Sequence, residues 1–390
     1  MSKKPIHVAQ VGCGRFAAGQ DMPNFKDNSD IECLWCCDSD IERARSVAAQ
    51  FGIPHATSDL QAVLADPDVD LIKIATSHEA HLPIIEAAAA AGKHVFCEKP
   101  LALDPLEGLK IVRAVRRGGI KLGVDYNRTC APAIRRLREV WQEHVAAPRH
   151  NPWRYIEIDR PLYPDETSSH LLVRIQDDSM TYVPVHMDPL RGGGPLIGET
   201  VHWLDLSCWF FAPQVPVEIL GWGSERFTHG VNIKFSGGDS ATILFHCAGT
   251  FDYPKELYEV TSNGALLRSE HFVENNYYGI PGLGRELFDL QFDCMPGIGD
   301  EGGLSGWQAK FNARVQGMSN CKEGFSELNV NKGHRAMLAG VIDAIRMGGP
   351  TPCDEFAGLR ATYLARLAGQ SIRLRQSLPV PVDQLVFDVL

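Results

Sequence analysis

The chain of 390 residues contains no apolar run of the ~18 residues that a membrane-spanning helix needs. It also lacks a basic excess, because 38 Lys and Arg stand against 48 Asp and Glu and give a net charge of −10. Such a chain is poorly suited to neutralising phosphates, so we expect neither a nucleic acid nor an anionic membrane as a partner. The first residues lead directly into an apolar strand and not into a signal peptide, and we therefore expect a cytoplasmic protein.

A metal-binding cysteine pattern is missing as well. The 11 cysteines are an odd number scattered along the chain, and only Cys33, Cys36 and Cys37 stand close together. These three fall in a strand-like run, where alternation sends neighbours to opposite faces, and no Cys or His pair follows at zinc spacing. We predict reduced, buried thiols and no metal site.

Up to about residue 125, apolar strands alternate with helical segments. This order predicts an α/β fold with a parallel sheet covered on both faces. The expected strands are Ile6–Val11, Ile31–Cys37, Leu71–Ala75, His94–Cys97 and Lys121–Tyr126, and the expected helices are Ile41–Phe51, Pro83–Ala91 and Pro105–Arg117.

After residue 150, strand-like runs follow one another with short connections, which predicts an α+β domain with a large, mostly antiparallel open sheet. The expected strands are Arg154–Asp159, Leu171–Gln176, Thr181–His186, Val217–Gly221, Val231–Phe235, Ala241–His246, Glu256–Thr261 and Leu266–His271. The expected helices are Leu196–Phe211, Gly333–Met347 and Leu359–Arg373. The Gly-rich stretch Pro281–Asn331 is long for a connection, and we expect it to be functional or to cover a site.

A glycine-rich turn follows the first strand. The run Gly12-Cys13-Gly14-Arg15-Phe16-Ala17 has the G-x-G-x-x-A spacing of a dinucleotide-binding turn. Its first glycine allows the tight turn, its second lets backbone approach a pyrophosphate, and Ala17 is small enough for close packing of helix and strand. The N–H groups of the helix that follows point at the phosphates.

An acidic residue, Asp38, ends the second strand, 24 residues beyond Gly14. A carboxylate there accepts hydrogen bonds from a ribose 2′-OH and repels a 2′-phosphate. Ser39 follows it instead of a basic residue, and we expect Arg43 and Arg45 to face solvent. The sequence therefore predicts NAD and not NADP, although Asp38 also fits a helix N-cap.

Further short motifs follow in order along the chain. They are Thr76 and His81, Ala91-Gly92-Lys93-His94-Val95, Glu98-Lys99-Pro100, Tyr126-Asn127-Arg128, Gly192-Gly193-Gly194, His202 with Asp205, Tyr253-Pro254-Lys255-Glu256 and Lys332-Gly333-His334. With these motifs, nearly the whole chain resembles the glucose-fructose oxidoreductase / inositol dehydrogenase / rhizopine catabolism (Gfo/Idh/MocA) family. The resemblance implies metal-free hydride chemistry and a homodimer or homotetramer that pairs through the open sheet.

The resemblance also implies two domains and their roles. Residues 1–128 would form the NAD-binding Rossmann domain, and residues 129–390 the substrate-binding and oligomerisation domain, with the C-terminal helices packing back on the first. The cofactor contacts expected from the family motifs are Gly12, Cys13, Gly14, Arg15, Phe16, Asp38, Thr76, Ser77, His81, Glu98, Lys99 and Asn127.

Two departures from the family pattern concern the site. The chain has Thr76-Ser77-His78 where Thr-Pro-Asn is usual. It has Gly198, followed by Glu199, where an Asp usually stands four residues before the catalytic His. The second departure makes Glu199 a candidate substitute for the missing acid.

Oxidation of a secondary alcohol by hydride transfer needs a base for the hydroxyl proton and a cation beside the developing alkoxide. Lys99 follows a strand at the edge of the sheet where ligands bind in such folds, and His202 can relay a proton. We expect Glu199, His202 and Asp205, spaced three apart, to share one helix face, with Glu199 orienting His202 and Asp205 anchoring the helix. A surface role for Lys99 and a helix-dipole role for Glu199 stay open.

Several other polar residues fall near the expected site. Arg128, His186, Asp188 and Arg191 join Lys99 and His202 as candidates for contacts to the substrate, with a structural role equally open for each.

Together these features predict an NAD-dependent oxidoreductase acting on a secondary alcohol of a sugar, sugar derivative or cyclitol. Two alternatives stay open. One is a redox-neutral glycosidase that passes through a transient 3-keto sugar, and the other is a non-catalytic NAD-binding regulator.

Overall fold

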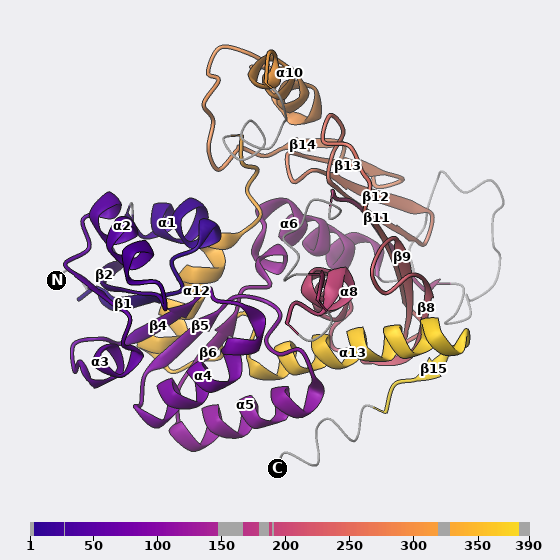
Figure 1. Cartoon of the computed structure of the whole chain (residues 1–390). Helices are drawn as coiled ribbons and strands as arrows, with labels where there is room; N and C mark the ends of the chain where they lie inside the picture. Colours follow the sequence, from indigo (N-terminus) through magenta and orange to yellow (C-terminus); the bar gives the residue numbers. More distant parts are fainter. Residues whose placement is uncertain are drawn as a thin grey trace.

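A computed structural model describes residues 4–26, 28–146, 167–178, 187–188, 191–318 and 328–381. Its first part is a six-stranded parallel sheet with the strand order β3-β2-β1-β4-β5-β6 (Figure 1). The strands are β1 (Ile6–Val11), β2 (Ile31–Cys37), β3 (His55–Thr57), β4 (Leu71–Ile74), β5 (His94–Cys97) and β6 (Leu122–Val124). The order reverses between β1 and β4, which is the arrangement of a dinucleotide-binding Rossmann fold.

Helices cover this sheet on both faces, so the inner strands are buried on both sides. Figure 1 shows α1 and α2 on one side of the sheet and α4 and α5 on the other. The helices are α1 (Met22–Lys26), α2 (Ile41–Phe51), α3 (Leu60–Ala65), α4 (His81–Ala90) and α5 (Pro105–Gly118).

The second part is a nine-stranded sheet with the order β14-β13-β12-β11-β7-β10-β9-β8-β15. All its pairings are antiparallel except that of β10 with β7. Its strands are β7 (His170–Gln176), β8 (Pro216–Gly223), β9 (His229–Phe235), β10 (Ser240–His246), β11 (Glu256–Ser262), β12 (Ala265–Glu270), β13 (Glu274–Tyr278), β14 (Arg285–Leu287) and β15 (Leu378–Pro379). The prediction of an α/β chain with a mostly antiparallel second sheet is confirmed.

Further helices follow β6 along the chain. They are α6 (Pro132–Val140), α8 (Gly194–Gly198), α9 (Val201–Phe210), α10 (Gly303–Val315), α12 (His334–Met347) and α13 (Glu355–Leu374). Helix α13 packs on α5 and β6 of the first part and on β8 of the second, so one helix braces both sheets. Figure 1 shows α10 beyond β14, far from the Rossmann sheet.

Three local predictions need correction. β3 was not predicted, because it has only three residues, His55–Thr57, and no apolar pattern. The single helix predicted over Leu196–Phe211 is two helices, because Glu199 leaves helical geometry at φ −127°. No helix or strand was predicted in the stretch Pro281–Asn331, which was expected only to be functional or to cover a site, yet it contains β14 and α10. The strands predicted at Arg154–Asp159 and Thr181–His186 lie outside the described residues.

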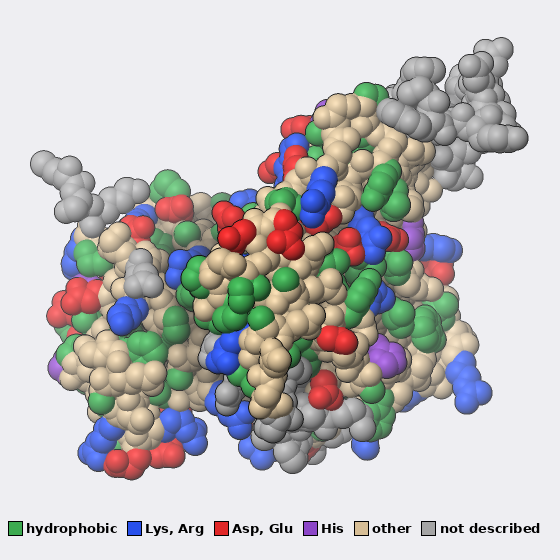
Figure 2. Space-filling view, turned by 90° about the horizontal axis from the view of Figure 1, so that it is seen from above, with side chains coloured by type: hydrophobic (Ala, Val, Ile, Leu, Met, Phe, Trp, Pro, Cys, Tyr) green, Lys and Arg blue, Asp and Glu red, His purple; other side chains and the backbone are tan. Residues whose placement is uncertain are grey.

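The cysteines among the described residues are free thiols, and those of the Cys33-Cys36-Cys37 group are buried or half-buried. No helix among the described residues is long and apolar enough to cross a membrane. On the face seen in Figure 2, basic side chains are interspersed with acidic ones.

Candidate active site

The glycine turn after β1 has one tightly packed glycine and one open one. Gly12 has φ +88°, and a Cβ there would come within 2.3 Å of the Ala75 carbonyl oxygen. A Cβ at Gly14 would meet no atom within 4 Å. The turn therefore needs glycine at position 12 for its own packing and leaves space at position 14 for a bound group. These two features fit the pyrophosphate of a dinucleotide.

Asp38 is held rigidly at the end of β2. Its Oδ2 accepts the Cys13 N–H at 2.8 Å, and its Oδ1 accepts the Asp40 N–H at 2.9 Å. The N-cap of α2 is Asp40, so the alternative that Asp38 caps this helix was wrong. Oδ2 keeps a second lone pair, so the carboxylate is oriented beside the glycine turn with acceptor capacity for a ribose hydroxyl.

Arg43 also differs from expectation. Its side chain is half exposed, but its Nη1 lies 3.3 Å from Asp38 Oδ1 instead of pointing only into solvent. The position of Arg43 one turn into α2 brings its guanidinium back over the strand end.

Lys99 follows β5 and reaches the break between α8 and α9. Its Nζ donates to the Gly198 carbonyl oxygen at 2.7 Å and to Glu199 Oε1 at 2.6 Å. Both side chains are partly accessible, at 15% for Lys99 and 19% for Glu199. The prediction that Glu199, His202 and Asp205 share one helix face was wrong, because the helix is broken at Glu199 and Asp205 turns to Arg360 at 3.3 Å. The break places the Glu199 carboxylate against Lys99.

His202 is buried next to a second charged pair. Arg128, from the short helix η3 (Asn127–Cys130), has Nη1 2.9 Å from His202 Nε2. Because arginine only donates, Nε2 accepts and Nδ1 carries the proton. Nδ1 is buried and has no hydrogen-bond partner among the described residues. Burial and the positive charges of Arg128 and Lys99 hold the pKa of His202 well below its usual value, so the ring is neutral.

Glu256, at the start of β11, was not predicted as a site residue. It is fully buried and accepts from Arg128 Nη2 at 2.9 Å, from Trp203 Nε1 at 3.0 Å and from the Tyr258 hydroxyl at 2.5 Å. Burial opposes its ionisation, but the Arg128 charge outweighs it and lowers the pKa of Glu256. In the sequence, Glu256 could have been recognised from its place inside the motif Tyr253-Pro254-Lys255-Glu256.

Lys255 and Lys332 were missed in the same way. Lys255 Nζ lies 2.7 Å from Asp177 Oδ2. Burial, together with the positive charges of Lys255 and Arg128, lowers the pKa of Lys332 to about 7. These lysines extend the group of charged residues around His202.

Three more of the predicted cofactor contacts, Asn127, His81 and Thr76, have structural partners. Asn127 is fully buried, and its Nδ2 donates to the Lys332 carbonyl oxygen at 2.8 Å. His81 is fully buried, with Nδ1 2.9 Å from the Pro100 carbonyl oxygen, so it supports the turn after Lys99. The Thr76 hydroxyl donates to the Ser77 carbonyl oxygen at 3.3 Å.

The predicted substrate residues are only partly brought together. Arg128 lies against His202, but Arg191 pairs with Glu79 at 3.0 Å. The Asp188 carbonyl oxygen accepts the Gly192 N–H at 2.8 Å, which shapes the Gly-rich turn before α8. His186 lies outside the described residues.

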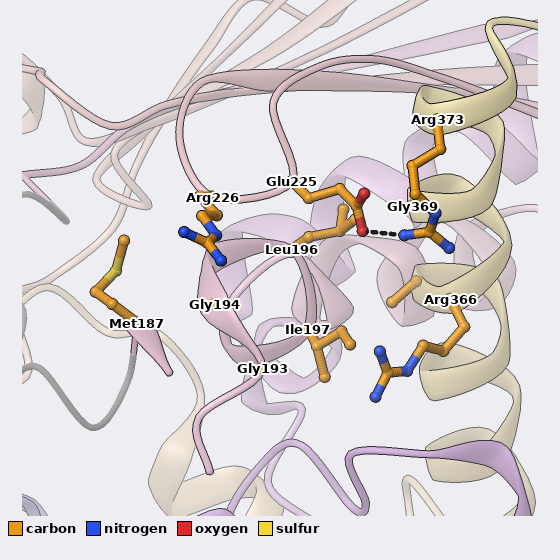
Figure 3. Close-up of a pocket in the computed structure, with 11 residues that line it drawn as sticks. Met187, Gly193, Gly194, Leu196, Ile197, Glu225, Arg226, Arg366, Gly369 and Arg373 are labelled. Carbon is orange, nitrogen blue, oxygen red and sulfur yellow. Dashed lines mark hydrogen bonds and ion pairs between the residues drawn. The ribbon is translucent and has the colours of Figure 1, made fainter. Parts of the chain in front are cut away.

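A separate cavity of about 210 Å³ lies beside α8 and α13 (Figure 3). Its lining includes Arg226, Arg366 and Arg373, and Arg373 pairs with Glu225. Neither Lys99 nor His202 lines it. The cavity is thus distinct from the candidate active site.

Comparison with known proteins agrees with this geometry. Residues 6–126 match the Gfo/Idh/MocA family, described as an oxidoreductase family with an NAD-binding Rossmann fold. The chain is 38% identical over 391 residues to the uncharacterized oxidoreductase YrbE of Bacillus subtilis, covering 97% of each chain. It is 29% identical over 241 residues to the 1,5-anhydro-D-fructose reductase of Ensifer adhaerens, a match that spans 58% of this chain and 65% of that protein.

A solved structure supports the fold. An oxidoreductase from Agrobacterium radiobacter, crystallised with NAD+, L-tartaric acid and magnesium, superposes with a TM-score of 0.73 at 19% identity, covering 96% of this chain and 98% of that one. The predictions of the family and of an NAD cofactor are confirmed. The chain belongs to the Gfo/Idh/MocA family of oxidoreductases with an NAD-binding Rossmann fold.

Proposed function

We propose that this protein is an NAD-dependent dehydrogenase that transfers a hydride between nicotinamide and a secondary alcohol of a sugar, sugar derivative or cyclitol. The observation that carries the proposal is the partly accessible Lys99–Glu199 pair, at 2.6 Å, on the edge of the sheet where the glycine turn also opens. NAD supplies the hydride acceptor when it is bound.

In this proposal the cofactor is held by the turn at Gly12–Phe16 and by Asp38. The backbone at Gly14 offers open space to the pyrophosphate, and the Asp38 carboxylate accepts from the ribose hydroxyls. The negative charge of Asp38 opposes a 2′-phosphate, which supports NAD over NADP.

Lys99 and Glu199 have different roles: Lys99 stabilises negative charge, and Glu199 accepts the proton. The Lys99 ammonium steadies the negative charge that develops on the substrate oxygen. The Glu199 carboxylate, which is the nearest acceptor to Nζ at 2.6 Å, takes the hydroxyl proton. In this way Glu199 fills the role of the acid that is usual four residues before the histidine.

His202 acts as a positioning residue in this arrangement, because its buried ring fixes Arg128. Its Nε2 is engaged by Arg128, so the proton sits on Nδ1, which has no protein partner among the described residues. A neutral ring does not compete with Glu199 for the proton of the substrate hydroxyl. Glu256 keeps Arg128 in place.

The substrate class rests on the charged and polar character of this site and on the sugars named for relatives. The Ensifer adhaerens relative is a 1,5-anhydro-D-fructose reductase, and an Escherichia coli relative is a D-glucoside 3-dehydrogenase. These names support a carbohydrate or cyclitol and select no single one.

The test is NADH formation across a panel of sugars, sugar acids, cyclitols and glycosides. We expect turnover with at least one of them, and a drop of about 100- to 10,000-fold in kcat for Lys99→Met and Glu199→Gln. Lys110→Met, which removes an exposed lysine on α5, is the matched control and should leave kcat unchanged. Absence of turnover with every compound would refute the proposal.

Two measurements test the two alternatives. Phenol release from aryl glycosides without added NAD and without net NADH would identify the redox-neutral glycosidase. A biological effect that survives Lys99→Met would identify the non-catalytic regulator.

We also propose a homodimer or homotetramer formed through the nine-stranded sheet. Leu172 on β7, Leu244 on β10 and Leu266 on β12 lie half-buried on the same face, opposite the buried Leu171, Val173 and Ile175 side. Half-buried leucines on an open sheet face support pairing with a second copy. Light scattering after size exclusion should show twice or four times the 43.0 kDa chain mass, and a monomer would exclude this interface.

A further inference from the structure

A charged side chain is completely buried beneath the candidate active site. Lys73, in β4, has no solvent exposure. Its Nζ lies 2.6 Å from Glu98 Oε1 and 3.4 Å from Asp21 Oδ1. It also lies 3.7 Å from Asp125 Oδ2, which in turn lies 3.1 Å from His334 Nδ1. We call these five residues the buried charge cluster.

The cluster occupies the carboxyl edge of the Rossmann sheet. Glu98 and Asp125 follow β5 and β6 directly, and Asp21 belongs to the helix that begins at the glycine turn. Glu98 also precedes Lys99 in the chain. Dinucleotides bind outside this edge in such folds. Since the nicotinamide must exchange a hydride with a carbon held near Lys99, its ring belongs to this same edge.

The cluster holds more acids than Lys73 alone can balance. Asp21, Glu98 and Asp125 are each more than nine-tenths buried, at 4%, 8% and 2% exposure. Asp21 Oδ2 has no hydrogen-bond partner among the described residues. A buried lysine needs one carboxylate as partner, and each additional buried acid is destabilising unless something else compensates it.

The protonation of the cluster leaves one excess negative charge. Burial and the neighbouring carboxylates raise the pKa of Glu98 well above its usual value, so Glu98 is the acid of the three that keeps a proton most readily. Burial raises the pKa of Asp21 to about 6, so it is mostly ionised at pH 7.5. Burial also opposes ionisation of Asp125, but the hydrogen bond from His334 and the positive charge of Lys73 outweigh it and lower the pKa of Asp125. Burial lowers the pKa of His334, which is neutral.

Two cations of the site, Lys99 and Arg128, already have anionic partners. Lys99 pairs with Glu199 at 2.6 Å and Arg128 pairs with Glu256 at 2.9 Å. Neither pair therefore offers an uncompensated carboxylate to a second cation. A positive ring at this edge would be attracted by the excess charge below it.

We propose that the buried charge cluster selects the redox state of the cofactor, binding the cationic nicotinamide of NAD+ more tightly than the neutral ring of NADH. This inference rests on the proposed function, because it concerns the same cofactor site. It makes Asp21 and Asp125 positioning residues that act through charge and not through contact with the substrate.

The test compares dissociation constants of NAD+ and NADH, each measured by titration at pH 7.5 without substrate. A single substitution of Asp21 or Asp125 should leave the net charge of the cluster unchanged, because Glu98 then loses its proton and supplies the missing negative charge. The double variant Asp21→Asn/Asp125→Asn removes the excess charge, as Lys73 then balances Glu98. We expect it to lower the preference for NAD+ about tenfold, the order expected for one charge several ångströms away inside a protein.

Three further variants make the result specific. Asp21→Asn/Glu98→Gln leaves Asp125 against Lys73, and we expect the same tenfold loss by a different route. Glu98→Gln alone replaces a protonated carboxyl by a neutral amide of the same shape, and the preference should change less than about twofold. Asp70→Asn, at the opposite edge of the same sheet, controls for loss of any carboxylate. Far-UV circular dichroism identifies variants that fold.

The outcomes separate the inference from the function. If the folded double variants keep the wild-type ratio of dissociation constants, or if Glu98→Gln lowers it equally, the charge argument is wrong while the proposed function stands. If wild-type protein binds neither nucleotide, the proposed function itself fails. A wild-type preference for NADH would also overturn the inference.

Discussion

Replacing Glu256 by glutamine is expected to destabilise the fold strongly, although the side chain keeps its size. Glu256 is fully buried and compensates the equally buried Arg128 through hydrogen bonds of 2.9 and 3.4 Å. It also accepts from Trp203 Nε1 at 3.0 Å. Removing the anion leaves the Arg128 charge uncompensated in the interior, which costs about 3–5 kcal/mol.

Urea unfolding followed by far-UV circular dichroism measures this loss as a change in the free energy of unfolding. The matched control is Glu286→Gln, which breaks a half-exposed pair with Arg136 at 3.1 Å. A pair at the surface is worth about 0.2–1 kcal/mol, so the control should lose no more than that. The double variant Arg128→Met/Glu256→Gln should recover part of the loss, because it leaves no uncompensated charge.

The reasoning fails if Glu256→Gln loses less than about 1 kcal/mol, or if the double variant is less stable than the sum of the single ones predicts. Either result would mean that Arg128 reaches solvent or a second anion when Glu256 is neutral. The same Glu256→Gln protein should also bind substrate more weakly, since Arg128 then no longer holds His202.

Further tests follow from individual contacts. Gly12→Ala places a Cβ within 2.3 Å of the Ala75 carbonyl oxygen at φ +88°, so we expect low yields of folded protein and no NAD binding, measured by fluorescence titration. Gly14→Ala meets no protein atom and should fold normally but bind NAD more weakly, and unchanged affinity would contradict the placement of the pyrophosphate. Burial lowers the pKa of His229 to about 4 and keeps it neutral in the fold. Its neutral ring therefore stabilises the fold above pH 6.5, the ordinary pKa of histidine, and this stabilisation is lost as pH falls. Between pH 7 and pH 5, the free energy of unfolding of the wild type should fall by about 2 kcal/mol more than that of His229→Gln. Asp40→Ala removes the N-cap of α2 and should cost about 1 kcal/mol in the same unfolding assay, and no change would mean that water replaces the cap.

Local patterns predicted the Rossmann part closely. β1, β2, β5 and α2 begin and end at the predicted residues. These elements are buried runs or amphipathic helices with their own caps, so neighbouring residues are enough to define them. The short β3 is different, since only its pairing with β2 makes His55–Thr57 a strand.

The candidate site follows partly from the sequence and partly from the tertiary structure. The sequence by itself determined the glycine turn, Asp38 and the positions of Lys99 and His202, because each follows a strand end or a motif with a fixed spacing. Only the tertiary structure decided that Glu199 faces Lys99, because a helix break changes a side chain's direction without any strong local signal.

The pairing of the buried charges also depends on the tertiary structure, because the partners are far apart in the sequence. Arg128 and Glu256 are 128 residues apart, and Lys73 and Glu98 come from neighbouring strands of a sheet. A single charged residue in a sequence looks like a surface residue, and nothing local shows whether a partner will be present when it is buried. Burial and pairing over long sequence distances arise only when the sheets and α13 assemble, so the electrostatics of this site follow from the fold and not from any motif.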